Sequence, residues 1–128
     1  MATRADHLRV LLVDDMPLMR NAVARFIGAR GGEVLVAGSA INALDVLQDH
    51  TIDVLVSEIQ MARHDGFWLI REVRSMPALR SLPAIAFTSL GPEHRQRILD
   101  AGFSEHVVKD NLHGLWLAIQ ALRRRAAG

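Results

Sequence analysis

The 128-residue chain contains no cysteine and no tyrosine, and its charges nearly cancel to a formal net charge of +1. Without cysteine, the chain cannot build a disulfide framework, use a thiol nucleophile or bind zinc through thiolates. The near-neutral charge gives no electrostatic reason to expect a nucleic-acid-binding domain. The six histidines include no pair three or four residues apart, so a histidine metal site is not expected.

Long hydrophobic runs are also missing. No segment approaches the roughly 18 apolar residues that cross a membrane, and the N-terminal MATRADHLRV lacks the pattern of a signal peptide. Half of the residues are nevertheless hydrophobic, enough for a domain of this size to bury its own core. We therefore expect a single cytoplasmic domain over residues 1–128 with no membrane contact.

Short apolar runs alternate along the chain with longer amphipathic segments. Runs rich in Val, Ile and Leu with polar or glycine borders are typical of strands buried on both faces of a parallel sheet. These runs cover 8–13, 33–38, 52–57, 83–88 and 105–108. The predicted helices cover 17–29, 40–49, 67–75, 91–101 and 112–124. Five strands that are each followed by a helix predict a doubly wound α/β domain with right-handed crossovers.

Local signals indicate where some of these elements begin and end. Ser39 is a good N-cap for the helix over 40–49, and Gly91-Pro92 a good start for the fourth helix. Gly31-Gly32 is expected to stop the first helix, and Asp65-Gly66 to form a turn. The apolar positions of the first helix recur at three- to five-residue steps and are Leu18, Val23, Phe26 and Ile27.

Chemically active residues follow four of the predicted strands. They are Asp14-Asp15, Glu58, Thr88-Ser89 and Lys109-Asp110. In open α/β sheets, ligands gather outside the carboxyl ends of the strands, where these residues should converge. Clustered carboxylates repel one another unless a cation intervenes, and oxygen ligands suit Mg²⁺. Because a hydroxyl and a lysine beside them would hold a phosphoryl group, the sequence predicts a metal-assisted phosphoryl site.

The same motifs carry a family resemblance. The segments LLVDD, DVLVSEIQMARHDG, FTS and AGFSEHVVKD occur in order, and the intervals between Glu58, Thr88 and Lys109 are ordinary for the family in question. Over nearly its whole length, the chain resembles the receiver domain of two-component response regulators, the chemotaxis-regulator fold. The resemblance implies a flavodoxin-like sheet of five parallel strands in the order 2-1-3-4-5 with five helices. It also implies a signalling module rather than an enzyme.

The resemblance assigns a role to each site residue. It implies that Asp15 binds Mg²⁺ directly and Asp14 through water, and that the backbone carbonyl of Gln60 completes the ligands with Glu58 at the phosphoacceptor position. Mg²⁺ is therefore a possible cofactor, although its binding is expected to be weak or absent, since the longer arm of Glu58 changes the ligand cage.

The resemblance also assigns roles around the phosphoryl group. Thr88 would bind the phosphoryl oxygens and report phosphorylation. Lys109 would pair with the phosphate or, before it arrives, with the carboxylate of residue 58. The implied partners are a histidine kinase or a downstream signalling protein.

The main departure from the family is Glu58, which stands where the family has aspartate. The extra methylene advances the carboxylate by about 1.5 Å, and misplacement on that scale costs around a hundredfold in rate. A glutamate supplies about one negative charge, against about 1.5 to 2 for a phosphoryl group. Our hypothesis is that the domain does not take phosphate and is biased toward one fixed state.

Three further departures point the same way. Ala62 replaces the proline that usually follows Met61. Asp110 replaces the proline that usually follows Lys109 in the cis form, so a trans peptide bond is expected here. His106 replaces the Tyr or Phe that rotates inward on activation, and as a switch residue it would add pH sensitivity.

Simpler interpretations stand beside these. Asp14-Asp15 alone would be read as the N-cap of the first helix, Thr88 as a cap of the next helix, and Lys109 as a solvated lysine. Arg123, Arg124 and Arg125 are expected to be a favourable charge cluster at a helix C-terminus rather than a nucleic-acid patch.

The last helix carries more apolar residues than one buried stripe needs. Leu115, Ile119 and Leu122 form that stripe. Trp116 and Leu117 lie beside it and suit a partner surface, with a wider buried stripe as the alternative. Receivers commonly pair through their fourth helix, fifth strand and fifth helix, so a homodimer through that face is possible.

Three functions therefore remain open at the level of sequence. The first is a receiver that acts by protein–protein contact without phosphorylation. The second is a conventional receiver that takes phosphate from a histidine kinase despite Glu58. The third is a dimerisation or docking scaffold that does not switch.

Overall fold

The structure of the protein is a computed structural model, which describes residues 7–127. The predicted absence of a signal peptide rests mainly on residues 1–6 and so lies outside the described residues, as do the two ends of the predicted 1–128 domain. Within residues 7–127, no helix combines the length and the apolar character needed to cross a membrane. The cytoplasmic location stays a prediction.

Five parallel strands form one sheet in the order β2-β1-β3-β4-β5, as predicted. The strands are β1 (Arg9–Val13), β2 (Glu33–Ala37), β3 (Val54–Ser57), β4 (Ala84–Thr88) and β5 (Glu105–Val108). Every residue of β3 and β4 is buried, and so is every residue of β1 after its first. This burial on both faces explains why these segments are continuous apolar runs rather than alternating ones.

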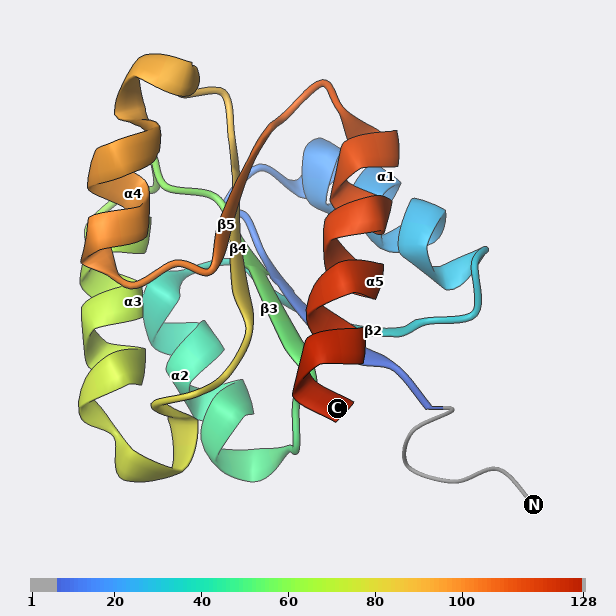
Figure 1. The fold of residues 1–128 in the computed structure, drawn as a ribbon, viewed down its shortest axis with the longest axis horizontal. Helices are drawn as coiled ribbons and strands as arrows, with labels where there is room; N and C mark the ends of the chain where they lie inside the picture. Colours follow the sequence, from blue (N-terminus) through green and yellow to red (C-terminus); the bar gives the residue numbers. More distant parts are fainter. Residues whose placement is uncertain (1–6, 128) are drawn as a thin grey trace.

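Helices cover both faces of this sheet. They are α1 (Pro17–Gly28), α2 (Ala40–Asp49), α3 (Gly66–Ser75), α4 (Arg95–Ala101) and α5 (Leu112–Ala127), with short 3₁₀ turns η2 (Pro77–Leu79) and η3 (Pro92–His94). Helices α1 and α5 lie on one face, and α2, α3 and α4 lie on the other (Figure 1). The arrangement is the doubly wound architecture that the alternating pattern predicts.

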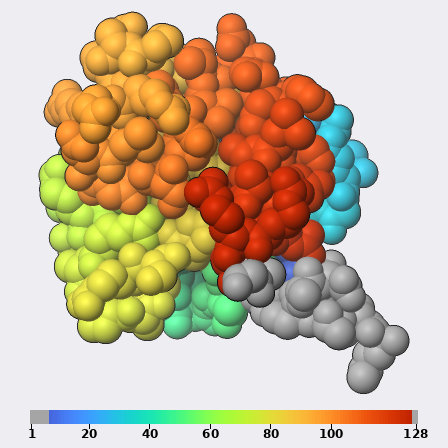
Figure 2. Space-filling model, viewed as in Figure 1, coloured from blue at the N-terminus to red at the C-terminus, as the bar shows by residue number. Residues whose placement is uncertain are grey.

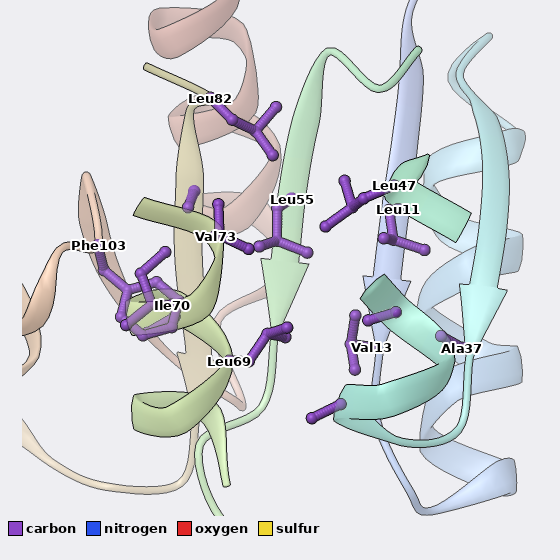
Figure 3. Close-up of a cluster of buried hydrophobic side chains, with 14 of the residues drawn as sticks. Leu11, Val13, Ala37, Leu47, Leu55, Leu69, Ile70, Val73, Leu82 and Phe103 are labelled. Carbon is purple, nitrogen blue, oxygen red and sulfur yellow. The ribbon is translucent and has the colours of Figure 1, made fainter. Parts of the chain in front are cut away.

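The sheet divides the hydrophobic core into two layers. One layer packs β1, β3 and β4 against α2, α3 and α4, and the other packs the opposite faces of these strands against α1 and α5. Figure 3 shows part of the first layer, in which side chains of the strands meet those of α2 and α3: Leu11, Leu55, Leu47, Leu69 and Val73. The two layers hold the carboxyl ends of the strands in fixed relative positions.

Two capped helices frame the loop after β3. The Ser39 hydroxyl accepts a hydrogen bond from the Asn42 amide at 3.1 Å, so the predicted N-cap of α2 is confirmed. Asp65 caps α3, because its carboxylate accepts from the Trp68 amide at 2.9 Å. The predicted turn at Asp65-Gly66 is therefore the first turn of α3. A Cβ at Gly66 would lie 2.5 Å from the Glu58 carbonyl oxygen, so only glycine lets the helix start this close to the end of β3.

The predicted helical start at Gly91-Pro92 is confirmed, but its first turn is a 3₁₀ turn. The chain does not enter α4 at Gly91-Pro92; it first makes the 3₁₀ turn η3, and the α-helix begins at Arg95. Proline suits the first turn of either kind of helix because its missing N–H is not needed there. The sequence signal therefore located a helical start without distinguishing the two types.

The apolar positions of the first helix do not all face the core. Leu18 is 88% exposed. The buried stripe of α1 runs through Met19, Val23 and Ile27, which are four residues apart and pack against the core. Side chains four apart share one helix face, so Leu18 falls beside the stripe. In α5, the predicted stripe of Leu115, Ile119 and Leu122 is buried as expected.

Candidate functional site at the carboxyl edge of the sheet

The strand register brings the predicted site residues together. Val13 pairs with Ser57 across β1 and β3, so the residues that follow them, Asp14 and Glu58, leave adjacent strands side by side. Thr88 ends β4 and pairs with Val108 of β5, which places Lys109 one residue beyond. Asp14, Glu58 and Thr88 are all buried. The predicted convergence at this edge of the sheet is therefore seen in the structure.

Lys109 lies between two buried carboxylates. Its Nζ is 2.8 Å from Asp14 Oδ2 and 2.8 Å from Glu58 Oε1. Both carboxylate side chains are only 5% exposed, and the lysine side chain is 12% exposed. We call these three residues the pocket triad. An ammonium has three protons to donate, so one lysine can bind both carboxylates at once, and the simpler interpretation of Lys109 as a solvated side chain was wrong.

The triad also sets the protonation of Lys109. Burial on its own would lower the pKa of the ammonium, but the hydrogen bonds to Asp14 and Glu58 and their negative charges outweigh burial and raise the pKa above its ordinary value. Lys109 is therefore held as a cation throughout the neutral pH range.

Both oxygens of Glu58 are bound by the chain itself. While Oε1 accepts from Lys109, Oε2 accepts from the backbone amides of Ile59 at 2.6 Å and Gln60 at 3.2 Å. The glutamate arm thus folds back over the start of the loop that follows β3. Gln60 lies at the rim of the site, where its side chain accepts a hydrogen bond from the Ser89 hydroxyl at 3.3 Å.

The two aspartates connect neighbouring loops. Asp14 Oδ1 accepts from the Met16 amide at 2.9 Å, and Asp15 Oδ2 accepts from the Ala62 amide at 3.0 Å, which ties the loop after β1 to the loop after β3. The N-cap of α1 is Met16, without a side-chain cap. The alternative that the aspartate pair caps α1 was therefore wrong.

Thr88 and His106 hold the loop between β4 and α4. The Thr88 hydroxyl accepts from the Leu90 amide at 3.3 Å, and His106 Nε2 lies 2.9 Å from the Leu90 carbonyl oxygen, to which it donates. The predicted switch residue His106 is 8% exposed, so it already points inward. Thr88 holds a loop amide rather than capping a helix, since the N-cap of η3 is Gly91.

One neighbour of the site escaped the sequence analysis. Arg20 of α1 donates from Nη1 to the Asp14 backbone carbonyl at 3.0 Å, and its Nε is buried without a hydrogen-bond partner. An arginine on a helix is ordinarily solvated, and nothing in its spacing signals this contact. The predicted trans peptide bond at Lys109-Asp110 is confirmed, since no cis bond occurs in residues 7–127.

The fold and the site together define a class of protein, a receiver domain of two-component signal transduction. The profile of the response regulator receiver domain matches residues 10–120. The chain is 39% identical over 124 residues to the gliding motility regulatory protein of Myxococcus xanthus, across 96% of this chain and 16% of that protein. The chain belongs to the response regulator receiver domain family.

Solved structures agree with this assignment. The chemotaxis protein CheY4 of Vibrio cholerae superposes with a TM-score of 0.84 at 28% identity, over 91% of this chain and 98% of that one. The response regulator TrrA of Thermotoga maritima, solved in complex with Mg²⁺ and BeF, gives a TM-score of 0.82 at 24% identity, over 90% and 98%. Receiver domains are generally non-enzymatic modules that interact with histidine kinases and downstream signalling proteins.

Receiver domains typically bind Mg²⁺ at their acidic pocket. Here the ammonium of Lys109 lies where a cation shared by Asp14 and Glu58 would lie. Across the part of the chain that the structure describes, no three carboxylate or histidine side chains are arranged to hold a metal ion. The donor set, as it is arranged, does not fit a resident Mg²⁺.

Proposed function

We propose that this receiver domain acts through protein–protein contact and that its output does not depend on phosphorylation of residue 58. The observation that carries the proposal is the state of the Glu58 carboxylate. One oxygen is bound by Lys109, and the other is bound by the amides of Ile59 and Gln60.

Phosphoryl transfer needs a carboxylate oxygen that is free to attack phosphorus. For Glu58, both oxygens are already oriented by donors within a buried site. The added methylene also moves the carboxylate about 1.5 Å from where an aspartate would present it, against the close alignment that such transfer requires. Glu58 instead places its carboxylate against Lys109, which is the residue expected to contact a phosphoryl group.

The proposed partner surface lies beside β5, the edge strand of the sheet. A groove of about 540 Å³ runs between β5 and α5, and its lining includes His106, Asp110 and Leu117. Leu117 is 53% exposed and Trp116 is half-buried. Figure 2 shows α4 and α5 together on the viewed face. We propose that a histidine kinase, a downstream signalling protein or a second copy of the domain docks on this α4-β5-α5 face.

His106 connects the site to that surface. It lines the groove, and its ring also binds the Leu90 carbonyl in the loop after Thr88. Lys109 follows three residues later on the same segment. A fixed Lys109–Glu58 contact therefore favours one fixed shape of the docking face, which supports an output that is always in the same state.

Intact-mass analysis after treatment with acetyl phosphate tests the proposal. We expect no mass increase for the unmutated protein or for Glu58→Gln, and a phosphoryl adduct only for Glu58→Asp, which restores the family's acceptor. A stable phosphorylated species in the unmutated protein that Glu58→Gln lacks would show that the domain is a conventional phosphoacceptor. Light scattering over a range of concentrations then separates a dimer from a monomeric docking module.

A further inference from the structure

We infer that Lys109 is the resident cation of the acidic pocket and that the domain does not take up Mg²⁺ while Glu58 holds the lysine there. This inference concerns the metal rather than the phosphoryl group. It goes beyond the proposed function, and either can fail without the other.

The position of the ammonium carries the first part of the argument. Lys109 Nζ touches Asp14 and Glu58 at the same distance of 2.8 Å. The two carboxylate oxygens are thus no more than twice that distance apart, with a positive charge between them. A divalent ion brought between the same oxygens would meet the ammonium at close range, where like charges repel strongly because water is largely excluded.

The remaining carboxylate oxygens carry the second part. Backbone amides bind the second oxygen of Asp14, the second oxygen of Glu58 and one oxygen of Asp15. Mg²⁺ demands near-ideal octahedral ligands at about 2.0 to 2.1 Å and loses its own water reluctantly. To gather these carboxylates, the ion would have to compete with several donors that already fix their positions.

The length of residue 58 decides which cation is held. On the same backbone, an aspartate carboxylate would end about 1.5 Å short of the Glu58 carboxylate. A 2.8 Å contact to Lys109 would then lengthen beyond hydrogen-bond range unless the lysine followed. Glu58→Asp therefore loosens the lysine while keeping every charge of the pocket, which makes it the discriminating variant.

Lys109 is the only lysine in the sequence. Protein grown with lysine labelled at Cε and Nζ therefore gives one lysine side-chain NMR signal, and that signal comes from the pocket triad. Glu93→Asp is the matched control, because it makes the same substitution on a side chain that is 70% exposed.

The experiment is a titration with MgCl₂ alone, to about 10 mM, without any phosphodonor. We expect the Lys109 signal to stay in place in the unmutated protein and in Glu93→Asp. In Glu58→Asp we expect a saturable shift within this concentration range. In Lys109→Met, which lacks the probe, the backbone amides of Asp15 and Ala62 should shift in the same saturable way.

A saturable shift of Lys109 and Asp15 in the unmutated protein over this range would overturn the inference. So would the absence of any response in Glu58→Asp, because the lysine would then not be what excludes the metal. If Lys109→Met does not fold, the titration of Glu58→Asp still tests the inference. Mg²⁺ uptake by an unmutated protein that gains no mass with acetyl phosphate would defeat this inference and leave the proposed function intact.

Discussion

Replacing Lys109 with methionine should destabilise the domain strongly at neutral pH, because it removes the only side-chain cation found between Asp14 and Glu58 among the described residues. Methionine keeps most of the apolar arm and loses the charge. Removing one partner of a buried ion pair typically costs about 3 to 5 kcal/mol. As a check, two carboxylates about 5 Å apart at an effective dielectric constant near 20 repel by about 3 kcal/mol. We expect the free energy of unfolding to fall by about 3 to 5 kcal/mol.

The loss should depend on the second carboxylate. In the double variant Glu58→Gln/Lys109→Met, Asp14 is left with a neutral neighbour. We expect that variant to recover most of the lost stability, since the repulsion between the two carboxylates is gone.

Urea unfolding followed by the fluorescence of Trp68 and Trp116 measures these differences. Arg71→Met is the control, since it removes an exposed cation from α3 and should change the free energy of unfolding by less than about 0.5 kcal/mol. A Lys109→Met protein as stable as the unmutated one at pH 7 would refute the reasoning. A double variant no more stable than Lys109→Met would refute it as well.

Three other predictions concern Lys109, Gly66 and Leu117. Because the folded state raises the pKa of Lys109, its stabilising effect should be complete below the unfolded value of about 10.4 and disappear as pH rises through the folded value. Urea unfolding at pH values above the unfolded pKa should therefore show a pH slope that Lys109→Met lacks. Gly66→Ala should lower the free energy of unfolding by at least about 2 kcal/mol, because its Cβ would lie 2.5 Å from the Glu58 carbonyl oxygen. The control Gly28→Ala, whose Cβ would meet nothing within 4 Å, should not destabilise the protein. Equal effects of the two variants in thermal or urea unfolding would contradict the steric argument. Leu117→Glu should leave the free energy of unfolding within about 0.5 kcal/mol. Where light scattering detects a dimer of the unmutated domain, Leu117→Glu should weaken it, and an unchanged dimer would place the contact elsewhere.

The strands were predictable from sequence because burial on both faces of the sheet requires several consecutive apolar residues. In β3 and β4 every side chain is buried, which requires a run of apolar residues with no alternation. A helix stripe is less certain from spacing alone. Leu18 and Met19 are adjacent and both apolar, and only the series through Val23 and Ile27 determines which of them faces the core.

The site was predictable in its membership and not in its contacts. The carboxyl ends of parallel strands meet at one edge of a sheet, so the sequence alone brings Asp14, Glu58 and Lys109 together. The contact of Lys109 with Glu58 spans 51 positions in the chain. Whether this contact forms depends on differences in side-chain length of about one methylene. The same is true of the hydrogen bonds from the backbone amides of Ile59 and Gln60 to Glu58. These distances are set by the packing around the loops, so the neighbouring sequence does not reveal them.

The role of Asp14 in binding Mg²⁺ stays a prediction, and the contact that the structure adds is the ion pair of Asp14 with Lys109. The sequence contains both candidates for the cation, a lysine and an implied Mg²⁺. Which of them is closer to the carboxylates depends on the arm of residue 58 and on the side chain of Lys109. Both are set by the folded structure.

The measurement that tests the role of Glu58 most directly is a titration of Mg²⁺ and beryllofluoride, a phosphoryl mimic, into the unmutated protein and into Glu58→Asp. The backbone amide shifts of Thr88, Lys109 and His106 report the response by NMR. We predict that only Glu58→Asp responds, which would mean that the glutamate alone removes an otherwise working receiver from phosphoryl transfer. Shifts of the three amide signals in the unmutated protein would contradict the account. The absence of shifts in both proteins would contradict it as well.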